Sequence, residues 1–158
     1  MRTFFCLSFL VVFIIFAGCS DTKKPAGLPA LHPCEVTITQ DGKPLAGANV
    51  VFYGDQTWAI GGGTDESGIA KIYTHGTFAG APAGTYKVTI TKTVTEGGPT
   101  EAERNDPSFS GGGGSTYDLV NPKFRSAGTT SLEVEVQSGK NTKTLDVEKS
   151  VKVLQPKV

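Results

Sequence analysis

The 158-residue chain has no excess of charge of either sign and no block of basic residues, because 15 Lys and Arg are balanced by 15 Asp and Glu. Nucleic-acid binding depends on neutralising phosphates, so this balance argues against a nucleic-acid partner. With 38% hydrophobic residues, the chain is too polar for a polytopic membrane protein and too apolar for a disordered one. Its length suits one domain with targeting and linker segments.

Cysteine is scarce, and its positions leave no pair for a disulfide. Cys6 lies in an N-terminal apolar run and Cys19 closes that run, so only Cys34 belongs to the expected folded domain. A domain with a single thiol forms no intramolecular disulfide. No electropositive neighbour activates Cys34, so we expect it to be a small buried hydrophobic residue on a strand.

Recognisable catalytic motifs are also missing. The sequence contains no Gly-x-Ser-x-Gly, no glycine-rich phosphate loop and no Cys-x-x-Cys. His32 and His75 are far apart, and two distant histidines rarely mark a metal site. Asp55, Asp65 and Glu66 could offer oxygens to calcium, but a solvated turn is the simpler interpretation. We therefore expect no enzyme activity, no metal and no cofactor.

The first 18 residues have the pattern of a secretory signal peptide. Met1 and Arg2 are followed by an almost purely apolar run from Phe4 to Ala17. As a helix this run would be about 21 Å long, short of the roughly 30 Å hydrocarbon core of a membrane. A positive start, a short apolar stretch and small residues at its end are typical of export.

The end of this run, Phe16-Ala17-Gly18-Cys19, resembles the lipobox of bacterial lipoproteins. The resemblance implies that residues 1–18 are removed and that acyl chains on Cys19 hold the mature chain on a membrane. Ser20 follows the cysteine where Asp would favour retention in the inner membrane, so the outer membrane or cell surface is expected. The alternative is an uncleaved anchor with an incidental cysteine.

Residues 19–33 are predicted to form a tether. Pro25, Gly27, Pro29 and Pro33 interrupt this short polar stretch and favour an extended chain over a helix. The folded domain is then expected over residues 34–153, followed by a short tail at 154–158.

From Cys34 onward, apolar residues recur with period two, which is typical of strands with one buried face. Turn signals such as Asp41-Gly42 separate the runs, and the glycines at 61–63 are expected to break the chain. No stretch after the leader shows sustained helical periodicity. The fold is therefore predicted to be all-β, an antiparallel immunoglobulin-like sandwich of about seven strands. The predicted inward-facing residues are Cys34, Val36, Ile38, Ala48, Val50, Phe52, Ala70, Ile72, Tyr86, Val88, Ile90, Leu132, Val134, Val136, Leu145 and Val147.

Residues 95–115 are polar and broken by glycine and proline. A loop of this length in a small domain is usually functional or disordered, and four consecutive glycines favour disorder because they lose the most backbone freedom on ordering. We predict a flexible insertion that is dispensable for folding. The alternative is a lid over a site, in which Phe109 docks on the sandwich.

Three blocks of the domain resemble the carboxypeptidase regulatory-like domain, a transthyretin-like member of the immunoglobulin-like sandwiches. They are Asp41-Gly42-Lys43-Pro44-Leu45-Ala46-Gly47-Ala48, Thr64-Asp65-Glu66-Ser67-Gly68 and Pro82-Ala83-Gly84-Thr85-Tyr86. With the lipobox, the chain is similar to short bacterial lipoproteins of the planctomycete type, in which one such domain follows the anchor. The resemblance implies a β-sandwich with no assigned chemistry.

Trp58, with Tyr53 shortly before it, is the candidate ligand-binding residue. Exposed aromatic side chains stack on sugar faces in starch-binding-like modules of the same sandwich class, whereas a lone Trp more often covers a core. We expect a lipid-anchored, non-catalytic module with a structural or adhesive role, attached to a membrane through Cys19 and binding an envelope protein or polysaccharide. The alternative is a carbohydrate-binding module that uses the Trp58 loop.

Overall fold

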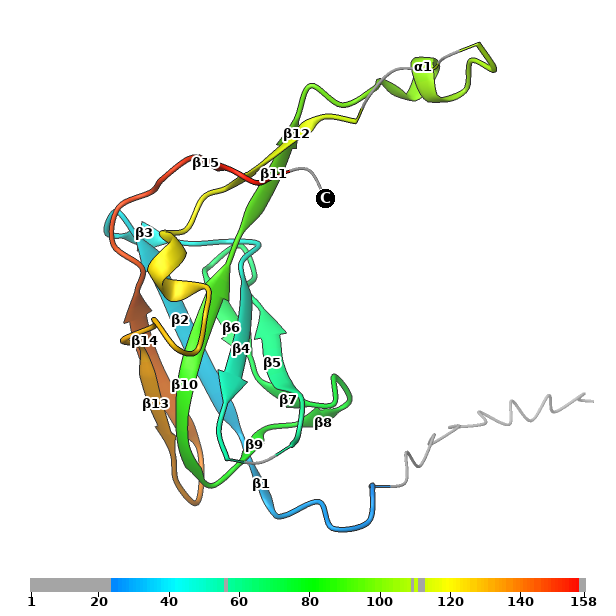
Figure 1. Ribbon diagram of the computed structural model, residues 1–158. Helices are drawn as coiled ribbons and strands as arrows, with labels where there is room; N and C mark the ends of the chain where they lie inside the picture. The colour runs from blue at the N-terminus through cyan, green and yellow to red at the C-terminus, as the bar shows by residue number, and fades with distance from the viewer. Residues whose placement is uncertain (1–23, 56, 109, 111–112, 157–158) are drawn as a thin grey trace, which may run out of the picture.

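The computed structural model describes residues 24–55, 57–108, 110 and 113–156, whose arrangement Figure 1 shows. The predicted signal peptide over 1–18 and the lipidation site Cys19 lie outside these residues. Within the described ranges, no helix is long and apolar enough to cross a membrane. The regular secondary structure of this part is almost entirely β-strand, so the all-β prediction is confirmed.

Two sheets form the body of the domain. The larger sheet has the strand order β13-β10-β4-β5-β7-β8; in the second sheet β2 pairs with β14, β3 and β6, and a short pair, β1-β9, lies where the chain enters (Figure 1). The bounds are β1 Leu31–His32, β2 Cys34–Gln40, β3 Lys43–Pro44, β4 Asn49–Tyr53, β5 Ile60–Gly63, β6 Ile69–Lys71, β7 Tyr73–Thr74, β8 Phe78–Ala79, β9 Ala81–Pro82, β10 Gly84–Thr91, β13 Glu133–Val136 and β14 Asn141–Asp146.

The core lies between these sheets, and the predicted alternation identifies it. β2 alternates strictly between buried and half-buried side chains, and β4 buries Val50 and Phe52. Tyr86 on β10 is 2% exposed, packs on the Phe52 ring with centroids 5.6 Å apart, and donates its hydroxyl to the carbonyl of Pro82 at 2.8 Å. Every predicted inward-facing residue is buried except Leu132, which is partly buried against the same core.

One pairing departs from the predicted antiparallel sandwich. β14 runs parallel to β2, with Asn141 opposite Cys34 and Asp146 opposite Thr39. β13 and β14 are consecutive, but β13 pairs with β10 in the larger sheet whereas β14 crosses to the second sheet. The two strands therefore do not form a hairpin, and β14 lies beside β2 in the same chain direction.

The prediction that the glycines at 61–63 break the chain is wrong, because they form most of β5. Gly61 pairs with Val51 and Gly62 with Val50 in the larger sheet. A side chain could not fit at the first two positions, since a Cβ on Gly61 would overlap the carbonyl oxygen of Val50 and one on Gly62 that of Lys71. The glycines therefore allow β4, β5 and β6 to approach closely.

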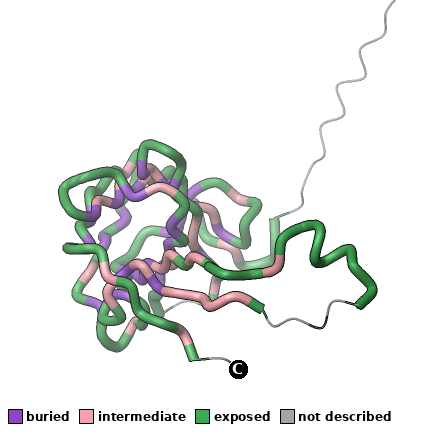
Figure 2. Tube along the Cα trace, turned by 90° about the horizontal axis from the view of Figure 1, so that it is seen from above, coloured by how far each residue is buried: buried purple, intermediate pink, exposed green. Residues whose placement is uncertain are grey.

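A three-stranded sheet projects from the body. β11 (Thr93–Glu96) follows β10 and pairs with β12 (Ser115–Asp118), which also pairs with β15 (Val153–Leu154). We call this sheet, with its connecting segment 97–114, the arm; Figure 1 shows it extending beyond the sandwich, and Figure 2 shows that little of it is buried. The segment predicted as a flexible insertion, 95–115, therefore begins and ends within paired strands.

The connecting segment contains the short helix α1 (Glu101–Arg104). Thr100 begins it with a capping box, in which the Thr100 hydroxyl accepts from the backbone N–H of Glu103 at 3.3 Å and the Glu103 carboxylate accepts from the N–H of Thr100 at 2.8 Å. These hydrogen bonds lower the pKa of Glu103. Phe109, the predicted anchor of a lid, lies outside the described residues, and the flexibility of the segment stays a prediction.

Paired structure also extends past both predicted limits of the domain. Leu31 and His32, assigned to the tether, form β1 opposite Pro82 and Ala81. Leu154, assigned to the tail, lies opposite Tyr117 in the arm. Two-residue strands leave no periodicity to detect, which is why the sequence did not reveal them.

Candidate functional site

Tyr53 lies on the outer face of the larger sheet, at the end of β4. Its side chain is 48% exposed, and Lys87 on β10 lies directly opposite. Lys87 pairs in turn with Glu133 on β13 through a 2.9 Å contact between its Nζ and the carboxylate. This row presents one exposed aromatic ring beside an ion pair, a surface suited to polar ligands.

Trp58 does not share that exposure. Its indole is half-buried, packs against the core, and meets the His75 ring edge-on with the centroids 5.3 Å apart. His75 adopts a positive φ of 53° and donates its backbone N–H to the carbonyl of Ala59 at 2.7 Å, which fixes the turn after β7 against the Trp58 loop. Trp58 and Tyr53 nevertheless line one shallow hollow of about 330 Å³.

Asp65 and His32 each accept hydrogen bonds from backbone N–H groups in different parts of the fold. One carboxylate oxygen of Asp65 accepts the backbone N–H groups of Ser67 and Ile69, both at 2.9 Å, and so closes the turn that the sequence predicts. His32 accepts from the N–H of Gly139 at 3.3 Å. In the described part of the chain, no three His, Cys, Asp or Glu side chains come together as a metal site would require.

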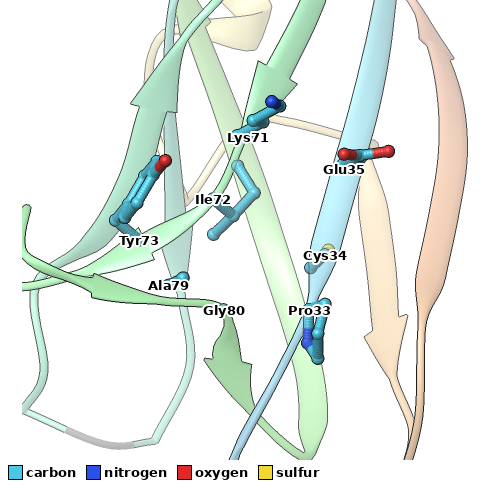
Figure 3. Close-up of a pocket in the computed structure, with 8 residues that line it drawn as sticks. All are labelled: Pro33, Cys34, Glu35, Lys71, Ile72, Tyr73, Ala79 and Gly80. Atoms are coloured by element: carbon cyan, nitrogen blue, oxygen red, sulfur yellow. The ribbon is translucent and has the colours of Figure 1, made fainter.

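Cys34 is buried at the start of β2 and helps to line a small cavity of about 100 Å³ (Figure 3). Burial, together with the charge of Glu35, raises the pKa of its thiol to about 11. The thiol is therefore protonated at neutral pH and unreactive as a nucleophile, as expected for a structural cysteine. Burial and the neighbouring Cys34 also raise the pKa of Tyr86.

A buried ion pair at the root of the arm was not found from the sequence. Asp118, at the end of β12, is 1% exposed and pairs with the guanidinium of Arg125. Its other oxygen accepts from the side-chain amide of Gln155 at 3.0 Å. Asp118 thus joins β12, the following loop and the C-terminal segment. The signal in the sequence that could have indicated this buried ion pair is the position of Asp118 between the apolar residues Tyr117 and Leu119.

One face of the arm carries a row of apolar side chains. Val94, Tyr117 and Leu154 lie opposite one another across the three strands. Lys152 extends over the Tyr117 ring, with its Nζ 4.5 Å from the centroid, and pairs with Glu96 at 2.7 Å. The bond to Glu96 raises the pKa of Lys152. The Lys152 side chain covers Tyr117 but not its neighbour Leu154, which is 58% exposed.

No family model, curated protein or solved structure significantly matches the chain. The fold defines a class, an all-β sandwich with a projecting arm, and no particular family within that class. The resemblance to carboxypeptidase regulatory-like domains is accordingly carried by the three sequence blocks.

Proposed function

We propose that this protein is a lipid-anchored, non-catalytic β-sandwich module that displays its arm at the cell envelope in a structural or adhesive role. The observation that carries the proposal is the placement of the two ends: the chain enters through β1 at one end of the sandwich, and the arm leaves from the opposite end (Figure 1). A lipid on Cys19 would hold the first end and leave the second free.

The chain between Cys19 and β1 gives the module limited reach. About a dozen residues intervene, and a fully extended chain of that length spans at most about 40 Å. Pro25 and Pro29 favour extension over a compact coil, but the N–H of Leu28 donates to the carbonyl of Pro25 at 3.2 Å in a turn, which makes the actual reach shorter than this limit. The proposed localisation is the outer membrane or cell surface, and the proposed relationship is to carboxypeptidase regulatory-like domains.

Replacement of the lipidated residue tests the anchor. In cells fed a labelled fatty acid, Cys19→Ser should abolish incorporation and release the protein from the membrane fraction. Cys34→Ala, which removes the buried thiol, should keep both the label and the membrane partition. Undiminished labelling of Cys19→Ser would overturn the proposal.

A carbohydrate-binding role is the second candidate, because Tyr53 is exposed at the rim of the hollow that Trp58 lines. Aromatic rings at such sites contact sugar faces, and Trp58 would report binding through its fluorescence. Purified protein should then be retained by an insoluble envelope polysaccharide, and Tyr53→Ala should release it. Thr144→Ala, on the exposed strand β14, is the matched control. Equal retention of both variants would reject this candidate.

A further inference from the structure

The C-terminal strand β15 leaves hydrogen-bonding groups of its backbone unpaired. Gln155 donates its N–H to the carbonyl of Thr116 at 2.8 Å, so Gln155 faces β12. Alternate residues of a strand face opposite edges, so Val153 also faces β12 while the peptide groups of Lys152 and Leu154 point away from the arm. Nothing in the described part of the chain pairs with this outer edge.

The same strand carries exposed apolar side chains on both of its faces. Val153 is 38% exposed and Leu154 58% exposed, and in the described residues Tyr53 is the only other large hydrophobic side chain with comparable exposure. Open edges with apolar side chains are templates for pairing with a further strand.

Three other edge strands carry features that normally prevent such pairing. β14 presents Lys143 and β3 contains Lys43 and Pro44, and β13 alternates Glu133 and Glu135 with its buried residues. The charge nearest to β15 does not protect it, because the Lys152 side chain turns back over the arm to its partner on β11.

We propose that β15 pairs edge to edge with β15 of a second copy of this chain, antiparallel and centred on Val153. In this register Lys152 lies opposite Leu154 of the second copy, so both outward peptide groups of each strand are bonded and no like charges meet. A shift of one residue toward the N-terminus would bring the two Lys152 residues together, which is unfavourable. The opposite shift would place Pro156, which has no N–H, opposite Lys152.

The pairing places the two sandwiches at opposite ends of a shared six-stranded arm sheet. Antiparallel strands run in opposite directions, and each body lies at the root of its own arm (Figure 1). Given the proposed lipid anchor, on which this step rests, the two copies would attach to two facing membranes. The contact is small, so it depends on the high local concentration that anchoring of many copies provides.

Disulfide trapping tests the register in the mature lipoprotein, in detergent micelles and on vesicles. In the proposed pair Val153 faces its own copy at a non-hydrogen-bonded position, with Cα atoms about 4.5 Å apart, whereas the two Leu154 Cα atoms lie about 8 Å apart, too far for a disulfide. Val153→Cys should therefore form covalent dimers at least about tenfold faster than Leu154→Cys. The buried Cys34 is no competing thiol.

The different exposure of Val153 and Leu154 makes the comparison of the two cysteine variants decisive. Random collision would favour Leu154→Cys, whose position is the more exposed of the two. Equal or faster dimerisation of Leu154→Cys, or no dimer from Val153→Cys beyond that of a Thr144→Cys control on β14, would overturn the proposal. A Val153→Lys variant should remain monomeric in sedimentation and should not cluster vesicles that the parent protein clusters. Membrane partition of these variants reports the anchor separately, so failure of the pairing and failure of the anchor are distinguishable.

Discussion

The carboxylate of Asp118 and the guanidinium of Arg125 form an ion pair in which the acid is fully enclosed and the base is about one-third exposed. The amide of Gln155 completes the site from the C-terminal segment. Burying a charge is unfavourable unless it is paired and hydrogen-bonded, so these three side chains depend on one another. They fix the base of the arm to the sandwich.

Asp118→Ala should therefore destabilise the protein strongly. The change leaves Arg125 without its partner and removes the acceptor of Gln155, and breaking a buried pair costs about 3 kcal/mol or more. Urea unfolding of the two proteins measures the difference. Glu133→Ala, which breaks the exposed pair with Lys87, should cost less than about 1 kcal/mol. Similar small losses for both variants would contradict a stabilising role of Asp118.

The glycines of β5 should differ sharply in their tolerance of a methyl group. Gly62→Ala would place a Cβ against the carbonyl of Lys71, so the strands must separate, at a cost of about 2 kcal/mol or more. At Gly63 the nearest atom to a Cβ, the carbonyl oxygen of Ala48, is 3.9 Å away, so Gly63→Ala should change stability by less than about 1 kcal/mol. Denaturant midpoints of the pair test the close approach, and equal midpoints would disprove it.

The buried thiol predicts how stability changes with alkaline pH. The pKa of Cys34 is about 11 in the folded protein and 9.0 for an unperturbed thiol, so the unfolded chain loses this proton first. The stability of the folded protein that depends on this protonated thiol is fully present below pH 9. It is lost as the pH rises from about 9 towards 11, because the thiol then ionises more readily in the unfolded chain. Cys34→Ala should show a weaker decline over that window in denaturant titrations. Parallel curves would mean that the thiol is not buried.

The connecting segment of the arm should be dispensable for folding. Replacing residues 97–113 by a short Gly-Ser link keeps the pairing of β11 with β12, and each doubling of loop length costs only about 0.6 kcal/mol. The denaturant midpoint should therefore change little. Truncation after Lys152 is the contrasting variant, because it removes β15 and Gln155 from the root of the arm. A loss above about 2 kcal/mol for the shortened loop would show that the connecting segment packs.

The body of this fold is readable in the sequence because its strands are long enough to alternate. Val36 and Ile38 on β2 lie on the buried side of a strict alternation, and that pattern depends only on local geometry. On β10 the same period identifies Val88 and Ile90, although Thr89 between them is buried as well. The turn at Asp41-Gly42 is equally local, since both residues adopt a positive φ. Such features need no knowledge of what lies across the core.

What the sequence did not reveal depends on distant partners. The glycines of β5 suggest a break unless the neighbouring strands β4 and β6 are known to approach them. The arm consists of strands of two to four residues, too short for a periodic pattern, and β15 joins β12 from a point far along the chain. The exposure of Tyr53 depends on the face of the sheet to which the end of β4 points. The partial burial of Trp58 depends on how the loop after β4 packs against the core and His75. Period and composition carry no information on these contacts.

The parallel pairing of β14 with β2 determines how the domain would carry tension. A membrane anchor would pull on the start of β2 through β1, and a partner held by the arm would pull on the chain that leaves the end of β14. These are the opposite ends of two adjacent parallel strands, paired from Cys34 with Asn141 to Thr39 with Asp146. Such a pull loads the whole ladder in shear, so its hydrogen bonds must fail together instead of opening one at a time.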